Sequence, residues 1–472
     1  MKDRHRNIDH ACQDAVGSLL TVAPIGGLVR QLAIPASVGF FFNTLLNVVD
    51  TYFAGMLSTD ALAALSLSFP VFFSLIAMGS GFSTGATALI GQALGAGRRS
   101  EAARVASQGL MLSAAATAVV TAAGYAVTPA LFRLLGASDA YLAICLAYIR
   151  VILLGSGFVF TVHMLNGMLT AQGDTRTFRD FLIAAAILNV GLDAWFLFGG
   201  LGVPAMGVAG IALATIVLQG GGVIALSLRV RRTGLLARGQ GVRWRPHWRT
   251  LRAIIGQGVP ASLSMMSVAL GIFIVTWFVS RYGQDVVAAY GVATRIEQIA
   301  HLPAIGLNVA AMILAAQNGG ARKYDRVRAA VRTCLGYGAM VAGAGTVALF
   351  AAARPMMSAF SSDPAVIEIG VRYLQIAALI QYAYVILMVN TSTLQGLKLP
   401  IFALWIGLYR HIAAPLGLFW LVTQVLSQGL MGIWWSLFGI SWSAAIIAAA
   451  VARRRIRQIE TASAARNAGE SC

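Results

Sequence analysis

Residues 32–57 read LAIPASVGFFFNTLLNVVDTYFAGML, an apolar run in which Asp50 is the single charged side chain. About 20 apolar residues in a helix cross the hydrocarbon core of a bilayer, so this run is long enough to span a membrane with some tilt. A carboxylate at that depth is costly and is seldom kept without a partner or an ion pathway. The run therefore predicts a transmembrane helix in which Asp50 is the first candidate for a functional residue.

The composition of the whole chain agrees with a membrane protein. Of its 472 residues 58% are hydrophobic and 11% are charged, whereas a soluble domain has about 25% charged residues. The net charge of +18 comes from arginines that lie between apolar segments, as expected for cytoplasmic loops. The lipid bilayer is therefore the expected partner, and a nucleic acid is not.

Hydropathy and helix-breaking residues predict twelve spans. Basic connectors follow the even-numbered spans, so both termini are expected on the cytoplasmic side of a bacterial inner membrane. The predicted spans are residues 31–57, 61–95, 102–132, 140–169, 180–199, 204–230, 251–281, 286–317, 327–352, 365–396, 399–423 and 428–452.

The two halves of the sequence repeat. A shift of 225 positions places Pro35-Ala36-Ser37 on Pro260-Ala261-Ser262 and Gln92 on Gln317. Six spans separate the copies, so both start on the same side of the membrane and a pseudo-twofold axis runs along its normal. Such internal repeats are typical of transporters.

The predicted fold is therefore an all-α membrane protein with twelve helices in two six-helix lobes. We expect cytoplasmic tails at both ends and a cytoplasmic linker between the lobes. The predicted boundaries are 1–24 for the N-terminal tail, 25–232 for the N-lobe, 233–250 for the linker, 251–455 for the C-lobe and 456–472 for the C-terminal tail.

The repeat is asymmetric at Asp50, which aligns with Val275. A purely architectural acid would be expected in both copies. Asn189 and Asp193 are four residues apart in another apolar run and so share one helical face. Two carboxyl groups that approach closely cannot both ionise cheaply, so Asp50 and Asp193 are expected to share a proton. Alternatively, Asp50, Asn189, Asp193 and a threonine could bind Na⁺.

The second half carries a weaker polar cluster. Glu297 and His301 are four residues apart on one helix and could pair, with Arg295 as a possible counter-ion. His163 and His411, the latter next to Arg410, are interpreted as packing or interface residues. Met and aromatic side chains suit a cavity for varied apolar or aromatic cations. The candidate substrate cavity comprises Asn43, Met265, Met266, Glu297, His301, Tyr382 and Trp405.

No sequence pattern indicates an enzyme or a resident cofactor. The chain has no phosphate-binding Gly-Lys-Ser/Thr loop and no nucleophile elbow. Its cysteines at positions 12, 145, 334 and 472 are scattered, without metal-site spacing. We therefore expect no structural metal, and H⁺ or Na⁺ as coupling ion.

Several segments together resemble the MATE (multidrug and toxic compound extrusion) family, over residues 25–455. They are VVDTYFAGMLSTDALAALSLSFP after Pro35, GATALIGQALGAG, LTAQGDTRTF, AQNGGARK and LQGLK. The resemblance implies a secondary antiporter that exports organic cations or amphipathic compounds in exchange for H⁺ or Na⁺. It also implies a monomer with small-molecule drugs or metabolites as cargo.

The DinF-like branch of that family is the one most similar to this chain. In that branch the cation site uses a span 1 aspartate, matching Asp50, and an Asn-x3-Asp of span 5, matching Asn189 and Asp193. A span 6 threonine matches Thr215. The NorM-like branch uses acids of spans 7 and 10, and here span 7 has none, nor has span 10 after Glu368.

Two other functions stay open at this point. A flippase of the same superfamily would move a lipid or a lipid-linked saccharide, although such proteins often have a cationic cavity. An integral membrane transferase would need a polar catalytic cluster at one membrane face, and the loops carry mostly Arg and Gly.

Overall fold

The computed structural model describes residues 19–200, 202–237, 239 and 241–470. Over this part of the chain it is helical, apart from turns and one isolated bridge between Gly200 and Val203. Eleven helices are long and apolar enough to cross a membrane, and a bent helix pair makes a twelfth span. The expected all-α, twelve-span membrane fold is thus confirmed.

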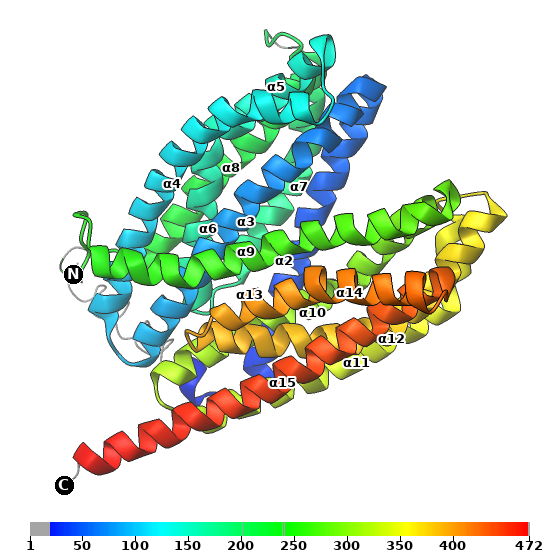
Figure 1. The fold of residues 1–472 in the computed structure, drawn as a ribbon. Helices are drawn as coiled ribbons and strands as arrows, with labels where there is room; N and C mark the ends of the chain where they lie inside the picture. The colour runs from blue at the N-terminus through cyan, green and yellow to red at the C-terminus, as the bar shows by residue number, and fades with distance from the viewer. Residues whose placement is uncertain (1–18, 201, 238, 240, 471–472) are drawn as a thin grey trace. The chain divides into compact units, whose positions relative to one another are not determined.

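The helices follow the predicted spans closely (Figure 1). In the first half they are α2 (Ile25–Leu57), α3 (Thr59–Gly95), α4 (Arg99–Leu134), α5 (Asp139–Leu154), α6 (Ser156–Ala171), α7 (Arg176–Phe198) and α8 (Val208–Arg232). In the second half they are α9 (Trp248–Val279), α10 (Gln284–Gly320), α11 (Tyr324–Ser358), α12 (Pro364–Gly396), α13 (Ile401–Leu408), α14 (Ala414–Trp420) and α15 (Gly429–Glu470).

Three details differ from the regular spans that the sequence predicts. The fourth span is bent by 46° at Gly155, where an added Cβ would lie 2.2 Å from the Ile216 side chain. The eleventh span contains two π-helical segments, η2 (Tyr409–Ala413) and η3 (Leu421–Val425). Helix α15 continues to Glu470, so the residues 456–470 assigned to a tail are helical. Residues 1–18 of the other predicted tail lie outside the described residues.

Two compact units make up the chain, and they divide within helices α2 and α9. Unit 1 contains Val38–Ser262, and unit 2 contains Gly17–Ser37 and Leu263–Cys472. Both divisions fall directly after the repeated Pro-Ala-Ser triplets. The N-terminal part of α2, up to Ser37, is therefore part of unit 2, and the N-terminal half of α9 is part of unit 1.

In unit 2, α2 crosses α10 at very short range. The hydroxyl of Ser37 donates a hydrogen bond to the carbonyl oxygen of Pro303 at 3.4 Å. An added Cβ at Gly306 would lie 2.1 Å from Ser37 Oγ and 2.3 Å from the Ala33 carbonyl oxygen. Only glycine fits under this crossing without a shift of the backbone.

Unit 1 repeats the same crossing between α9 and α3. Ser262 donates to the carbonyl oxygen of Met78 at 3.5 Å, and an added Cβ at Gly81 would lie 2.0 Å from Ser262 Oγ. Met78, Gly81 and Ser262 of this crossing correspond to Pro303, Gly306 and Ser37 of the other one. The members of each pair are 225 positions apart in the sequence. The repeat in sequence is thus also a repeat in helix packing.

Two buried side chains of α4, Ser107 and Gln108, hold the predicted linker to unit 1; the hydroxyl oxygen of Ser107 accepts from the backbone N–H of Arg243 at 3.3 Å. Gln108 Nε2 donates to the carbonyl oxygens of Arg243 at 2.8 Å and Arg245 at 3.0 Å. Gln108 Oε1 accepts from the backbone N–H of His247 at 2.8 Å. Residues 243–247 are therefore fixed in place rather than loosely tethered.

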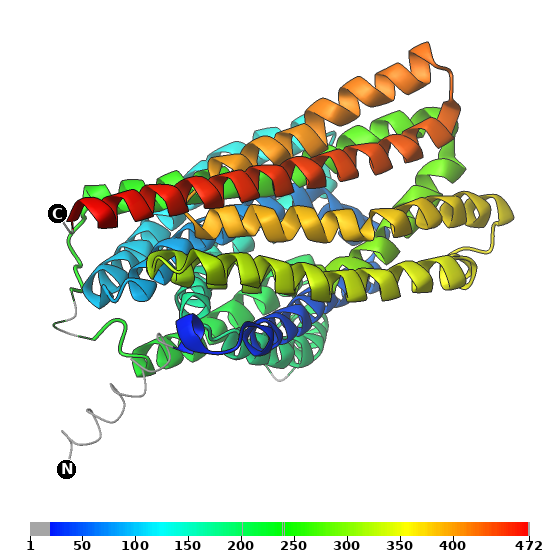
Figure 2. The same ribbon diagram turned by 90° about the horizontal axis from the view of Figure 1, so that it is seen from below.

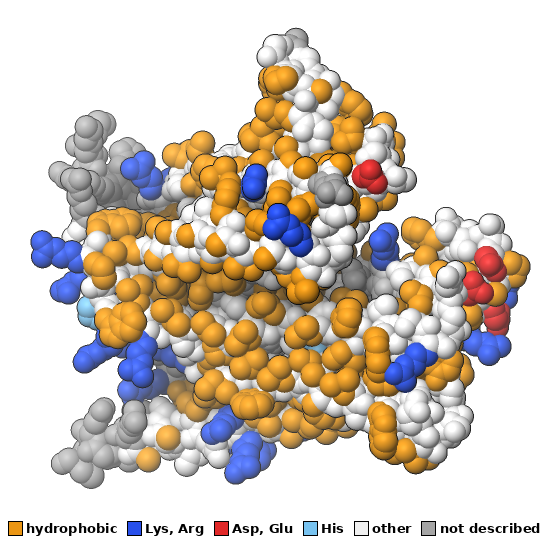
Figure 3. Space-filling view, turned by 45° about the horizontal axis from the view of Figure 1, so that its top comes forward, with side chains coloured by type: hydrophobic (Ala, Val, Ile, Leu, Met, Phe, Trp, Pro, Cys, Tyr) orange, Lys and Arg blue, Asp and Glu red, His pale blue; other side chains and the backbone are white. Residues whose placement is uncertain are grey.

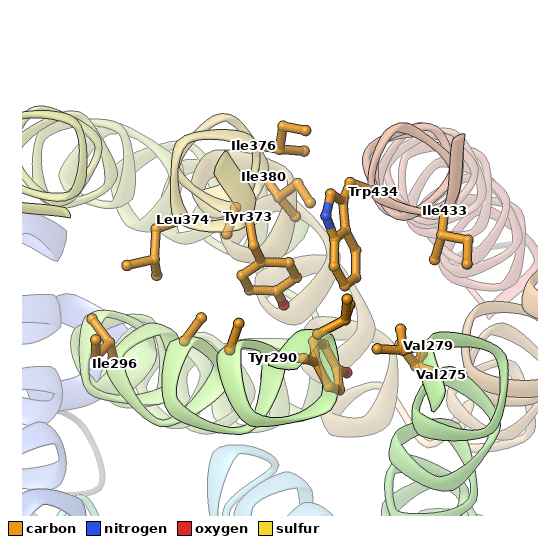
Figure 4. Close-up of a cluster of buried hydrophobic side chains, with 14 of the residues drawn as sticks. Val275, Val279, Tyr290, Ile296, Tyr373, Leu374, Ile376, Ile380, Ile433 and Trp434 are labelled. Atoms are coloured by element: carbon orange, nitrogen blue, oxygen red, sulfur yellow. The ribbon is translucent and has the colours of Figure 1, made fainter. Parts of the chain in front are cut away.

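Apolar side chains form the interior of each unit and much of the surface. In unit 2, helices α11, α12 and α15 run side by side (Figures 1 and 2). The rings of Tyr290, Tyr373 and Trp434 pack within 5.7 Å of one another in its core (Figure 4). The face in Figure 3 is dominated by hydrophobic side chains with few acids, as a lipid-facing surface requires.

Candidate functional site

Asp50 lies in the C-terminal part of α2, within unit 1, and its side chain is turned away from solvent. The residue is 9% exposed. Its Oδ1 accepts a hydrogen bond from Asn189 Nδ2 of α7 at 3.2 Å. Its Oδ2 accepts a long hydrogen bond from the hydroxyl of Thr215, on α8, at 3.5 Å. Three helices thus converge on one carboxyl group.

Asp193 completes this group, which we call the Asp50 site: Asp50, Asn189, Asp193 and Thr215. The i, i+4 spacing on α7 sets Asn189 and Asp193 on one face, and both are buried. The carboxyl group of Asp193 lies beside that of Asp50, near enough for a hydrogen bond when one is protonated. Both oxygens of Asp193, and Oδ1 of Asn189, have no hydrogen-bond partner among the described residues.

Electrostatically, the site has acids without a nearby base. No Lys, Arg or His forms an ion pair with Asp50 or Asp193 in the described part of the chain. The unsatisfied oxygens are buried, and each costs about 1–3 kcal/mol when it lacks a donor. Proton transfer to one carboxyl group, or a bound cation, would remove this cost. The arrangement can therefore hold a positive charge.

Tyr148 of α5 was not identified by sequence reasoning. It is 4% exposed and close enough to Asp50 and Asp193 for their charges to act on its hydroxyl group. It packs in the core cluster of unit 1 that also contains Phe53 and Ile211. A tyrosine within an apolar run is common, so the sequence carried no signal that could have singled it out.

Unit 2 has no counterpart of Asp50, because Val275 occupies that position. Val275 is 6% exposed and belongs to the apolar core drawn in Figure 4. Glu297, in the interior of α10, is an acid of this unit, and its Oε2 accepts a hydrogen bond from the hydroxyl of Tyr373 at 2.6 Å. Its Oε1 lies 3.8 Å from His301 Nε2, which is an electrostatic contact but too long for a hydrogen bond.

The other predicted cavity residues are dispersed. Asn43 is an exposed residue of α2 in unit 1, and its carbonyl oxygen accepts from Asn47. Met265 and Met266 on α9 are half-buried, and Trp405 on α13 is 64% exposed. Tyr382 packs against the apolar cluster between α2 and α10 in unit 2. Apart from Glu297 and His301, the structure does not bring these side chains into one group, and their role in binding stays a prediction.

The described residues contain no group of three or more His, Cys, Asp or Glu side chains arranged to hold a metal ion. Cys145 and Cys334 are free and buried. The atoms of the Asp50 site that can coordinate a cation are oxygen atoms, the ligand type that hard cations prefer.

The amino-acid sequence matches known transporters over most of its length. A probable multidrug resistance protein, YoeA of Bacillus subtilis (strain 168), is 29% identical over 323 residues, or 68% of this chain and 70% of the relative. A FAD transporter of Shewanella oneidensis is 28% identical over 424 residues, or 89% of this chain and 90% of the relative. A probable multidrug resistance protein, NorM of Thermotoga maritima, is 26% identical over 86% of this chain and 87% of its own.

Solved structures have the same fold. A crystal structure of MATE in complex with MaD3S superposes with a TM-score of 0.88 at 24% identity, over 94% of this chain and 99% of the other. An outward-facing multidrug resistance MATE transporter of the MOP superfamily gives 0.87 at 24% identity over the same shares. The MatE family model matches residues 35–195 and 260–417. The chain therefore belongs to the MATE family, whose members are membrane transporters and not enzymes.

Proposed function

We propose that this protein is a secondary active exporter of organic cationic or amphipathic compounds, driven by exchange for H⁺ or Na⁺. The observation that carries the proposal is the Asp50 site, where two buried acids and an amide oxygen lack a positive partner. Its residues match the cation site of the DinF-like branch, to which we assign the chain. We expect a monomer in the bacterial inner membrane with both termini in the cytoplasm.

The proposed mechanism is alternating access. Entry of H⁺ or Na⁺ from outside neutralises the acids of the Asp50 site, and loss of that charge alters the packing of α2 and weakens the binding of a cationic substrate. Asp50, Asn189, Asp193 and Thr215 would hold the ion through their oxygen atoms. A membrane potential contributes about 2.3 kcal/mol per charge for each 100 mV.

Dye transport in inside-out membrane vesicles tests this proposal. The vesicles contain the full-length protein, and uptake of ethidium into the lumen corresponds to export from a cell. We expect uptake with an acidic lumen or with a Na⁺-loaded lumen, and loss of uptake when that gradient is collapsed. Vesicles without the protein and vesicles with Asp50→Asn serve as controls, and uptake driven by neither gradient would refute the proposal.

One relative supports a second cargo class. The FAD transporter of Shewanella oneidensis aligns over 89% of this chain, and FAD combines flat aromatic rings with a negatively charged pyrophosphate. Release of FAD from cells that overproduce the protein, compared with cells that carry Asp50→Asn, would distinguish flavin export from export of cations alone. A lipid flippase, the other alternative, would instead bind polyprenyl lipids and not dyes.

A further inference from the structure

Arg410 stands in the middle of the eleventh span, residues 401–425. At 1.5 Å per residue it lies about 14 Å from the first residue of that span, deeper than lipid headgroups reach. A charged side chain at this depth marks a functional site by default. Arg410 is also on the π-helical segment η2, and such segments are frequent at functional sites.

Small residues of α9 fix the position of this segment within unit 2. An added Cβ at Gly271 would lie 2.8 Å from Cβ of His411, so the two backbones approach closely there. Nδ1 of His411 forms a hydrogen bond with the hydroxyl of Ser267 at 3.1 Å. His411 is thus engaged with α9, and the neighbouring Arg410 contacts α12 instead.

The guanidinium group of Arg410 is surrounded by groups that do not neutralise it directly. Its central carbon lies 5.2 Å from the ring centroid of Tyr384. The other ring contact of Tyr384 is with His301, stacked at 4.0 Å between centroids. Glu297 is near enough for its charge to act on Arg410, but its short hydrogen bond is with Tyr373.

Hydrogen-bond donors are therefore left over in this group. The guanidinium group of Arg410 has no hydrogen bond and no ion pair with any residue that the structure describes, and Nε2 of His301 is buried without a hydrogen-bond partner. A guanidinium carries five N–H donors in a planar fork that matches a carboxylate or phosphate. Such donors at mid-membrane depth call for an acceptor that the protein itself does not supply.

We propose that Arg410 and His301, with the ring of Tyr384 beside them, form a subsite for the carboxylate or phosphate group of a transported compound. The proposal deepens the proposed export function, since it adds compounds that carry an anionic group on an aromatic body to its cargo. Before the compound binds, the negative charge of Glu297 partly offsets the positive charge of Arg410. The anionic group of the cargo therefore competes with Glu297 for Arg410.

Two dyes that differ by one charge test the subsite. Rhodamine B has a free carboxylate, and in its ethyl ester that group is blocked. Binding is measured by fluorescence polarisation with full-length protein in phosphatidylcholine nanodiscs, without any ion gradient. Arg410→Gln should weaken binding of rhodamine B about tenfold or more, because a charge-assisted hydrogen bond is lost. Binding of the ester should be unchanged.

Arg281→Gln is the matched control. Arg281 also lies over an aromatic ring, 4.0 Å from the Trp277 centroid, but outside this group, so neither dye should be affected. Equal weakening of both dyes by Arg410→Gln, no weakening, or failure of the wild type to bind rhodamine B would each overturn the proposal.

A second variant decides the matter if Arg410→Gln does not elute as a folded monodisperse protein. Glu297→Gln removes the competing charge while keeping an acceptor for Tyr373, so rhodamine B should bind several times more tightly. Unchanged or weaker binding would contradict the subsite. Because no gradient is used, failure of ethidium transport in vesicles would refute the export function and leave this binding result readable.

Discussion

The Asp50 site of unit 1 and the Glu297 group of unit 2, which comprises Glu297, His301, Tyr373, Tyr384 and Arg410, each hold a carboxyl group within a long apolar helix, with opposite surroundings. Asp50 has an amide, a hydroxyl group and a second acid around it. Glu297 has a phenol that donates a hydrogen bond, and the charge of Arg410 nearby. The first arrangement lacks positive charge and the second contains it. The two halves of a repeated chain thus differ in the charge that surrounds these acids.

The largest effect is expected from Asp50→Asn, which removes the negative charge of unit 1 that has no counterpart in unit 2. The one amide oxygen of asparagine can still accept from Asn189, and its N–H can donate to the hydroxyl oxygen of Thr215, so the fold should persist. Gradient-driven dye uptake should fall roughly tenfold or more, since the charge that the coupling ion neutralises is gone. Asp60→Asn, at an exposed acid in the first turn of α3, is the control and should leave uptake unchanged. Full uptake by Asp50→Asn at equal protein levels would contradict the assignment.

Val275→Asp tests the same difference by placing an acid at the position of unit 2 that corresponds to Asp50. Val275 is buried in an apolar core cluster, so an acid there should lower the free energy of unfolding by about 3 kcal/mol or more. Chemical denaturation in detergent micelles measures this loss. Val275→Asn has a similar shape without the charge and should lose less. Equal losses would mean that charge is not what distinguishes the two positions.

Gly81→Ala and Gly306→Ala probe a feature that the units share. Each methyl group would overlap a serine hydroxyl and neighbouring backbone, and overpacking typically costs about 1–3 kcal/mol. We expect similar losses of unfolding free energy in the two variants. Gly343→Ala, where nothing lies within 4 Å of an added Cβ, should be neutral or slightly stabilising. If only one of the two variants loses unfolding free energy, the two crossings do not contribute equally to stability although their packing is alike.

Tyr373→Phe removes the hydroxyl group that donates to Glu297. A hydrogen bond to a charged group contributes about 1.5–3 kcal/mol, so the unfolding free energy should fall by up to that amount. Tyr290→Phe is the control, because Tyr290 packs in the same aromatic core and its hydroxyl group makes no hydrogen bond within the described part of the chain. If Tyr373→Phe is as stable as Tyr290→Phe, the hydrogen bond from Tyr373 to Glu297 does not stabilise the fold.

The smallest effect concerns a loop acid, Asp174, between α6 and α7. Burial alone would raise the pKa of Asp174, but hydrogen bonds from Arg229 and Thr177 lower it below its usual value. Its contribution to stability is therefore complete above the ordinary pKa of about 4 and is lost as the pH falls through the lowered pKa. The corresponding turn of unit 2, residues 397–400, has no acid.

Asp174→Asn should accordingly lower the unfolding free energy by about 1 kcal/mol near pH 7. The difference from the wild type should shrink as the pH is lowered below 4. Thermal unfolding at several pH values in detergent measures it. Asp180→Asn, a mostly exposed acid paired with the adjacent Arg179, is the control. A difference that grows with acidity would contradict this sign.

The sequence predicted the spans and the Asp50 site for a shared physical reason. Charged residues are so rare within apolar runs that Asp50 and Asp193 were visible at once, and helical periodicity added Asn189. Uncharged side chains that reach an acid from another helix do not stand out in an apolar run. For this reason Tyr148 and Tyr373 were not identified from the sequence. Arg410 was given no role of its own, and only the neighbouring His411 was interpreted as a packing or interface residue, because the π-helical segment that carries both is not visible in the sequence.

The division of the units inside α2 and α9 has a consequence for the gene. If the gene were divided in the connector near residue 237, it would encode two polypeptides. Neither polypeptide would contain a complete unit. The first would carry Leu28, Val29 and Leu32, which pack in unit 2, and the second would carry Ile254, which packs in unit 1. Each fragment would expose an apolar helix half until it meets the other. Each half of this repeated chain thus contributes a helix segment to the unit that the other half forms.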